Sequence, residues 1–241
     1  MPMPLLEVCV GDPESLEAAI AGGADRIELC SALEIGGLTP TPGLMALAAA
    51  APVPVYAMVR PRGGGFVFSE PERRAMLADI AAIRTAGLAG VVLGASRPDG
   101  TLDRDTLAEL ADASAGLGLT LHRAFDLVPA IEPAVDLAVD LGFERILTSG
   151  RAATATEGLA DLARAHAWAA GRLAIMAGSG LSAGNVGTLL ARVPLGEVHG
   201  SCSAAVGPGD ANAQRLGFGE SRRRTDADEV RRMKASLLEA G

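Results

Sequence analysis

The chain has 241 residues, of which 49% are hydrophobic and 21% charged, and its net charge at pH 7 is −8. Such an apolar composition is enough for a sizeable core and argues against disorder. Basic residues are scattered apart from Arg222, Arg223 and Arg224, so no basic stripe indicates a nucleic-acid partner. Binding of small anionic ligands is still possible, because a few arginines that converge in one pocket can bind them whatever the overall charge.

The sequence shows no sign of a membrane span or a disulfide framework. No apolar run approaches the roughly 18 residues of a membrane helix, and the first residues lack the pattern of a signal peptide. Cys9, Cys30 and Cys202 are too few and too odd in number for paired disulfides. We therefore expect a cytoplasmic protein with reduced thiols and no membrane partner.

Short β-branched segments alternate with longer Ala- and Leu-rich segments, as in repeated βα units around a parallel sheet. Strands are expected at residues 5–10, 26–30, 55–60, 90–94, 119–125, 145–148, 173–177 and 197–200. The helices after them are expected to begin near Pro13, Leu44, Pro71, Arg104, Pro129, Thr156, Ala183 and Asp226. Two doubly wound domains would also alternate, but no linker separates them and eight units fit ring closure. The sequence predicts one (β/α)₈ barrel, the TIM barrel, over residues 1–241, with its chemistry at the C-terminal ends of the strands.

The longest segment without clear periodicity is residues 204–225. It follows the eighth strand, and we expect it to be a loop that overhangs the mouth of the barrel. Loops of this length are usually functional or disordered.

The first two strands each carry a glutamate and a cysteine on one face. Side chains alternate along a strand, so Glu7 and Cys9 share a face, as do Glu28 and Cys30. Neighbouring strands lie about 4.8 Å apart, so the two thiols are expected to approach each other near the mouth. Soft thiolates select Cu(I), zinc or iron–sulfur clusters, which indicates a Cu(I) site at Cys9 and Cys30. Plain core packing of the cysteines is the alternative.

The third strand ends in arginines and glycines that are typical of an anion site. Arg60 and Arg62 precede the glycines of residues 63–65. Arginine binds carboxylate or phosphate with a planar fork, and glycines let backbone amides approach a ligand. In the alternative interpretation, the two arginines neutralise Glu7 and Glu28 in a structural network.

The fifth strand ends in a group capable of acid–base chemistry. His122, Arg123 and Asp126 lie together there, and a histidine near a carboxylate can transfer protons close to neutral pH. His122, Asp126 or Glu28 is thus a candidate catalytic residue, and Arg123 a candidate anion ligand. His199 on the eighth strand can also face the mouth.

The seventh strand ends in Gly178, Ser179 and Gly180, ahead of the next helix. Barrels often bind phosphate with the loops after strands seven and eight, so these residues are candidates for an anion site. Glycine turns also simply connect strands to helices, which is the alternative.

Several motifs in one order resemble those of the copper homeostasis protein CutC family. They are E-V-C-V, G-A-D-R-I-E-L-C, G-G-L-T-P-T-P-G, R-P-R-G-G, H-R-A-F-D and R-I-L-T-S-G. The resemblance implies a TIM barrel that is usually a homo-oligomer, and a Cu(I) site at Cys9 and Cys30. Gly65 stands where the family commonly has an acidic residue, and G-S-G at 178–180 replaces a more usual G-G-G.

Two functions follow from these patterns. The first is copper homeostasis through Cu(I) bound by Cys9 and Cys30. The second is an enzyme, of lyase or isomerase type, acting on a small anionic or phosphorylated metabolite at the other side of the mouth. Fold alone does not decide between them.

Overall fold

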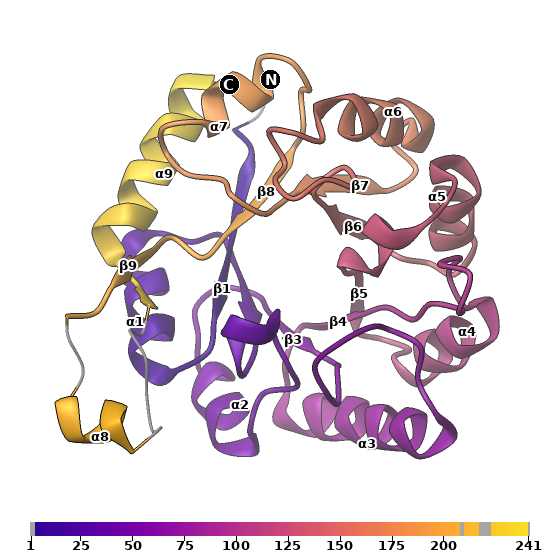
Figure 1. Ribbon diagram of the computed structural model, residues 1–241, viewed down its shortest axis with the longest axis horizontal. Helices are drawn as coiled ribbons and strands as arrows, with labels where there is room; N and C mark the ends of the chain where they lie inside the picture. Colours follow the sequence, from indigo (N-terminus) through magenta and orange to yellow (C-terminus); the bar gives the residue numbers. More distant parts are fainter. Residues whose placement is uncertain (1–2, 208–209, 217–222, 241) are drawn as a thin grey trace.

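The computed structural model describes residues 3–207, 210–216 and 223–240. Eight strands close into a barrel in chain order, each parallel to its neighbours, with β8 beside β1. They are β1 (Leu5–Val10), β2 (Arg26–Leu29), β3 (Val55–Met58), β4 (Gly90–Leu93), β5 (Gly118–Leu121), β6 (Arg145–Thr148), β7 (Ala174–Ala177) and β8 (Glu197–Gly200). The predicted (β/α)₈ barrel is confirmed (Figure 1).

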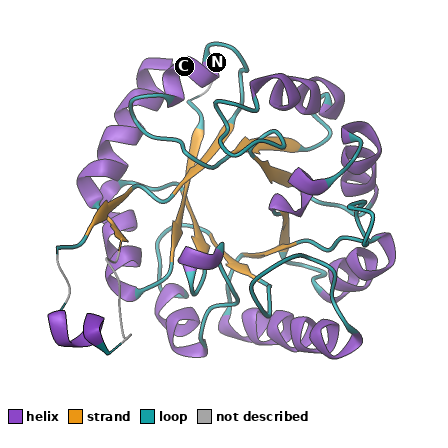
Figure 2. Ribbon diagram, viewed as in Figure 1, coloured by secondary structure: helices purple, strands orange, loops and turns teal. Residues whose placement is uncertain are grey.

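Helices surround the strands on all sides (Figure 2). They are α1 (Pro13–Gly22), α2 (Pro42–Ala48), α3 (Glu70–Ala86), α4 (Arg104–Ala113), α5 (Ile131–Asp140), α6 (Leu159–Ala169), α7 (Val186–Leu190) and α9 (Ala227–Ala240). Local chemistry starts two of them: Asp12 caps α1, and Ser69 forms a capping box with Glu72 at α3. Within the described part of the chain, no helix is both long and apolar enough to cross a membrane.

Alternation along the strands separates an outer core from a polar interior. Leu6, Val8 and Val10 of β1 point toward the helices and are fully buried in the main hydrophobic cluster. Glu7 and Cys9, on the opposite face of the strand, point into the barrel, as the sequence predicts. The apolar core therefore lies between the sheet and the helices, and polar chemistry is left to the barrel interior.

Charged side chains close the barrel beneath its mouth. Arg26 donates to Glu7 at 2.5 Å and to Glu197 at 2.5 Å. The guanidinium groups of Arg145 and Arg26 lie 4.9 and 5.5 Å from the ring centre of Tyr56. These contacts pair the buried charges and fill the floor of the barrel.

Two expectations about segments after strands are wrong. The fifth strand ends at Leu121 rather than residue 125. Arg123–Leu127 form the 3₁₀ helix η2, and the His122 side chain caps its N-terminus by accepting a hydrogen bond from the Ala124 amide. The expected loop at 204–225 instead contains α8 (Ala211–Arg215) and an antiparallel pair, β9 (Ser203–Ala205) and β10 (Arg223–Thr225). In Figure 1, α8 lies outside the ring of helices rather than over the mouth. Residues 208–209 and 217–222 lie outside the described residues.

Candidate functional site

A cavity of about 550 Å³ opens at the C-terminal ends of the strands. The predicted site residues that line it are Cys9, Glu28, Arg60, His122, Arg123, Ser179 and Gly180. Arg62, Asp126, Gly178 and Cys30, also predicted, are not among its lining residues. Its volume is typical of a site for a small molecule.

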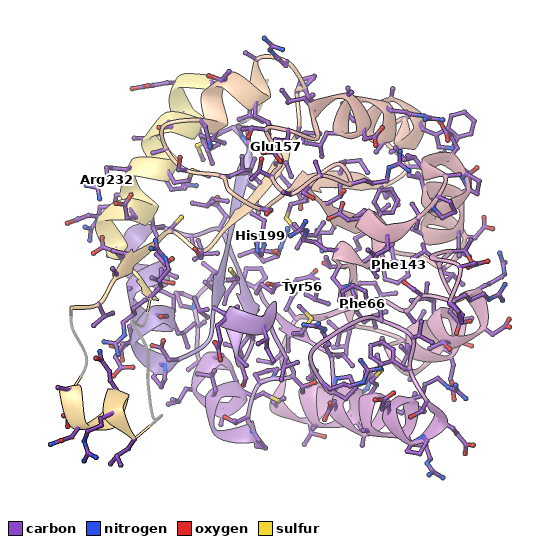
Figure 3. The ribbon with its side chains drawn as sticks, viewed as in Figure 1. Tyr56, Phe66, Phe143, Glu157, His199 and Arg232 are labelled. Atoms are coloured by element: carbon purple, nitrogen blue, oxygen red, sulfur yellow. The ribbon has the colours of Figure 1, made fainter. Side chains whose placement is uncertain are left out.

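Three potential metal ligands meet at one wall of this cavity. One ligand atom from each of Cys9, Glu28 and His199 lies within 4.8 Å of the other two, and all three residues are buried. Strand register explains the meeting, because Cys9 pairs with Glu28 across β1 and β2, while Glu7 pairs with His199 across β1 and β8. His199 points into the centre of the barrel in Figure 3.

Glu7 holds the His199 ring in place. Its Oε1 lies 2.8 Å from His199 Nδ1, and His199 Nε2 lies 3.7 Å from a Glu28 carboxylate oxygen. Burial lowers the pKa of His199, but electrostatic interaction with Cys9 and Glu28 and hydrogen bonds to Cys9 and Glu7 outweigh it and raise that pKa well above its usual value. A carboxylate on the far nitrogen is the arrangement that orients metal-binding histidines.

Cys30 is outside this group of ligands. The Cys30 amide bonds to the Val10 carbonyl at 2.9 Å, and its thiol lies 3.6 Å from a Glu28 oxygen. Burial and the Glu28 charge raise the pKa of the Cys30 thiol well above its usual value. The register places Glu28 opposite Cys9, and Cys30 follows two residues further along the chain.

The two arginines after β3 have different surroundings. Arg60 is buried and donates to the carbonyls of Ile35, Gly37 and Gly64 at 2.7–3.0 Å. Arg62 is half-exposed and pairs with Glu72 of α3 at 2.5 Å. The alternative that they neutralise Glu7 and Glu28 is wrong for Glu7, which pairs with Arg26 and His199.

His122 lines the cavity on the β5 side. Its Nδ1 accepts a bond from the Ala124 amide at 3.1 Å, and its ring centre lies 4.7 Å from that of Phe66. Burial and the nearby Arg60 charge lower the pKa of His122 to about 3. The imidazole is therefore neutral near pH 7.

Asp126 is fully engaged in local structure. Its carboxylate accepts from the Thr148 hydroxyl at 2.5 Å, from the Ser149 amide and hydroxyl at 3.0–3.2 Å, and from the Arg151 amide at 3.1 Å. It also pairs with Arg123 at 2.6 Å. These bonds fix the loop after β6. The Asp126 carboxylate, predicted as a proton-transfer partner of His122, is thus bonded to that loop and to Arg123.

We expect Asp126→Asn to lower the free energy of unfolding by about 2–3 kcal/mol, because it weakens several charge-assisted hydrogen bonds at once. Urea unfolding measures this change. Asp136→Asn is the control, since Asp136 is half-exposed and bonds Arg172 at the surface, where the loss should stay below about 1 kcal/mol. Equal effects of the two substitutions would contradict the structural role of Asp126.

The loop after β7 approaches the cavity with strained backbone. Ser179 and Gly180 have φ angles of 82° and 71°, a region that costs a residue with a Cβ roughly 1 kcal/mol or more. At Gly178, a Cβ would lie 2.6 Å from the Leu147 side chain and 3.3 Å from His199. Gly178 thus lets this loop sit close to the metal-ligand group, and Ser179 and Gly180 line the cavity.

The sequence interpretation missed part of this site. The sequence allows His199 to face the mouth but does not identify it as a ligand. Cys202 and Arg223 also line the cavity. Burial, followed by the electrostatic influence of Cys9, raises the pKa of Cys202 to about 11. Ring closure was the available signal for His199, because the eighth strand of a closed barrel must lie beside the first.

Comparisons with known proteins agree with the motifs. The family model described as the CutC family matches residues 4–204. A CutC family protein of Sinorhizobium medicae is 58% identical over 234 residues, covering 97% of this chain and 96% of its own. One from Caulobacter vibrioides is 52% identical over 210 residues, covering 87% and 86%.

Solved structures show the same relationship. A CutC protein of Streptococcus agalactiae, to which copper homeostasis is provisionally assigned, is 31% identical with a TM-score of 0.79, covering 83% of this chain and 99% of its own. A phosphoribosylanthranilate isomerase of Thermotoga maritima shares the fold alone, at 14% identity and a TM-score of 0.60, covering 98% and 100%. The chain therefore belongs to the CutC family.

Proposed function

We propose that this protein acts in copper homeostasis by binding Cu(I) at the mouth of the barrel, with Cys9 and His199 as ligands. The observation that carries the proposal is the meeting of the Cys9 thiol, the His199 imidazole and the Glu28 carboxylate within 4.8 Å. The name of the Streptococcus agalactiae relative, which refers to copper homeostasis, points the same way.

The donor atoms fit copper. Thiolate sulfur selects Cu(I) and imidazole nitrogen also suits copper, so Cys9 and His199 supply a soft pair, and Glu28 is a harder third neighbour. Glu28 Oε1 is buried with no hydrogen-bond partner among the described residues, so it is free to take part if a harder ion such as Zn²⁺ binds instead. The Cys9 and Cys30 pair expected from the sequence is the competing ligand set.

An anaerobic competition titration against a chromophoric Cu(I) chelator tests the proposal. We expect one Cu(I) per chain, with affinity falling at least about 100-fold in Cys9→Ser, because loss of an outer-sphere partner alone costs 10–100-fold. His199→Asn should behave similarly. Cys30→Ser, the same chemical change at a thiol outside the group of three ligands, should change affinity by less than about threefold.

The outcomes are distinct. If the single variants Cys9→Ser and Cys30→Ser each lost Cu(I) binding, the result would favour a site made of the two thiols. Unchanged Cu(I) affinity in Cys9→Ser would contradict any copper site at this wall. A parallel Zn²⁺ titration in which only Zn²⁺ binds stoichiometrically would overturn the copper assignment while keeping the metal site.

A second function, an enzyme acting on a small anionic metabolite, is favoured by the cavity itself. Its volume is about 550 Å³, and its lining includes the cationic residues Arg60, Arg123 and Arg223 together with Glu28. A thermal-shift screen of metabolites tests it, because a ligand held in the cavity raises the melting temperature. No stabilisation by any anion, phosphate and sulfate included, would count against it.

A further inference from the structure

Arg60 is a buried cation without a carboxylate partner in the described part of the chain. Its side chain is 5% exposed, and among the described residues the guanidinium bonds to the backbone carbonyls of Ile35, Gly37 and Gly64 alone. Its Nε has no acceptor among the described residues. Buried charges are normally paired, because removing a charge from water without a counter-charge costs several kcal/mol. The positive charge of Arg60 is therefore available to an anionic ligand in the cavity.

His122 supplies a second unused donor on the same side of the cavity. Its Nδ1 accepts from the Ala124 amide, so the proton of the neutral ring is on Nε2. The described residues offer Nε2 no acceptor, and the residue is 3% exposed. The nearby guanidinium and the burial that lower its pKa to about 3 keep the ring neutral, so it donates a hydrogen bond without adding a second charge.

Phe66 links the two donors. The Arg60 guanidinium lies 5.1 Å from the centre of the Phe66 ring, and the His122 ring centre lies 4.7 Å from it. All three residues line the cavity. Both donor nitrogens are shielded from solvent. A ligand that bonds to them therefore displaces no water from these two atoms, and its hydrogen bonds form in a low-dielectric environment that strengthens them.

We infer that this side of the cavity binds the carboxylate of a small organic acid, with one oxygen on Nε of Arg60 and the other on Nε2 of His122. Two single N–H donors match the two oxygens of a carboxylate, whereas a phosphate presents three terminal oxygens. Both nitrogens are shielded from solvent, so binding requires a local rearrangement of the side chains that cover them. The inference rests on the second proposed function, a ligand-binding cavity, and does not require copper.

Calorimetric titration of the metal-free protein tests it, with acetate, pyruvate, malonate and succinate in one arm and inorganic phosphate in the other, at matched ionic strength. We expect one or more of the carboxylates to bind, and phosphate to bind at least about tenfold more weakly. Arg60→Gln and His122→Asn should each weaken carboxylate binding at least about tenfold. Arg164→Gln and His166→Asn, the same chemical changes on α6, are the matched controls and should leave it unchanged.

Each outcome has a definite meaning. If Arg60→Gln fails to fold because the loop carbonyls lose their donor, His122→Asn decides alone. Carboxylate affinity within about threefold of the parent in His122→Asn would overturn this site while the ligand-binding cavity stands. Binding of phosphate but of no carboxylate would also overturn it and move the anion to the loop after β7. Binding of neither would overturn both this inference and the second proposed function.

Discussion

Glu7→Gln is expected to lower the free energy of unfolding by about 3–5 kcal/mol, because it removes the charge from one partner of a buried ionic network. The Glu7 side chain is fully buried and pairs with Arg26 at 2.5 Å and with His199 at 2.8 Å. Those two contacts hold its pKa well below the usual range although burial raises it. Without the carboxylate, two positive groups stay in the barrel interior with less compensation.

Urea unfolding near neutral pH measures this loss, and Glu144→Gln is the matched control. Glu144 belongs to the same network, bonding Tyr56 and Arg145 at 2.9 Å, but its side chain is 46% exposed. Water screens that position, so the control should lose less than about 1 kcal/mol. Equal losses in the two variants would mean that burial does not set the strength of the Glu7 contacts.

The fold was predictable because its signals are local. Asp12 and Ser69 mark helix starts in the sequence, and their side chains cap α1 and α3. Gly23 and Gly87 end the same helices with φ angles of 92° and 78°, which glycine adopts readily. Each βα unit therefore carries its own boundaries, and their number fits a closed ring.

The candidate site was only partly predictable because it depends on register between strands. Alternation correctly sent Cys9 and Glu28 into the barrel, but it is a property of one strand and does not say which residues face each other across two. Barrel closure requires a fixed stagger, and here that stagger puts Cys9 opposite Glu28 and leaves Cys30 beyond them. His199 enters the group through the same closure, from the other end of the chain.

Residues 204–225 show a different limit. β9 and β10 have three residues each, too few for alternation to identify a strand. Their pairing joins positions about twenty residues apart, such as Ser203 and Thr225. No local pattern in the sequence encodes that contact.

His122 is expected to make the protein acid-sensitive. Its pKa is about 3 in the native state against an ordinary value of 6.5, so between those values the unfolded chain binds a proton that the native protein does not. Stability therefore rises with pH and is lost as pH falls below about 6.5, by up to about 1.4 kcal/mol for each pH unit. Between about pH 6.5 and pH 4, the free energy of unfolding falls by about 3 kcal/mol through this effect.

Urea unfolding of the parent and of His122→Asn at several pH values between about 7 and 4 isolates the effect. Carboxylates such as Glu7 also lose stability in acid, but they are present in both proteins and cancel in the difference. The difference between the parent and the variant should therefore shift in favour of the variant by about 3 kcal/mol across this range. A constant difference would mean that native His122 takes up its proton as readily as the unfolded chain, which is incompatible with a neutral donor beside the Arg60 guanidinium.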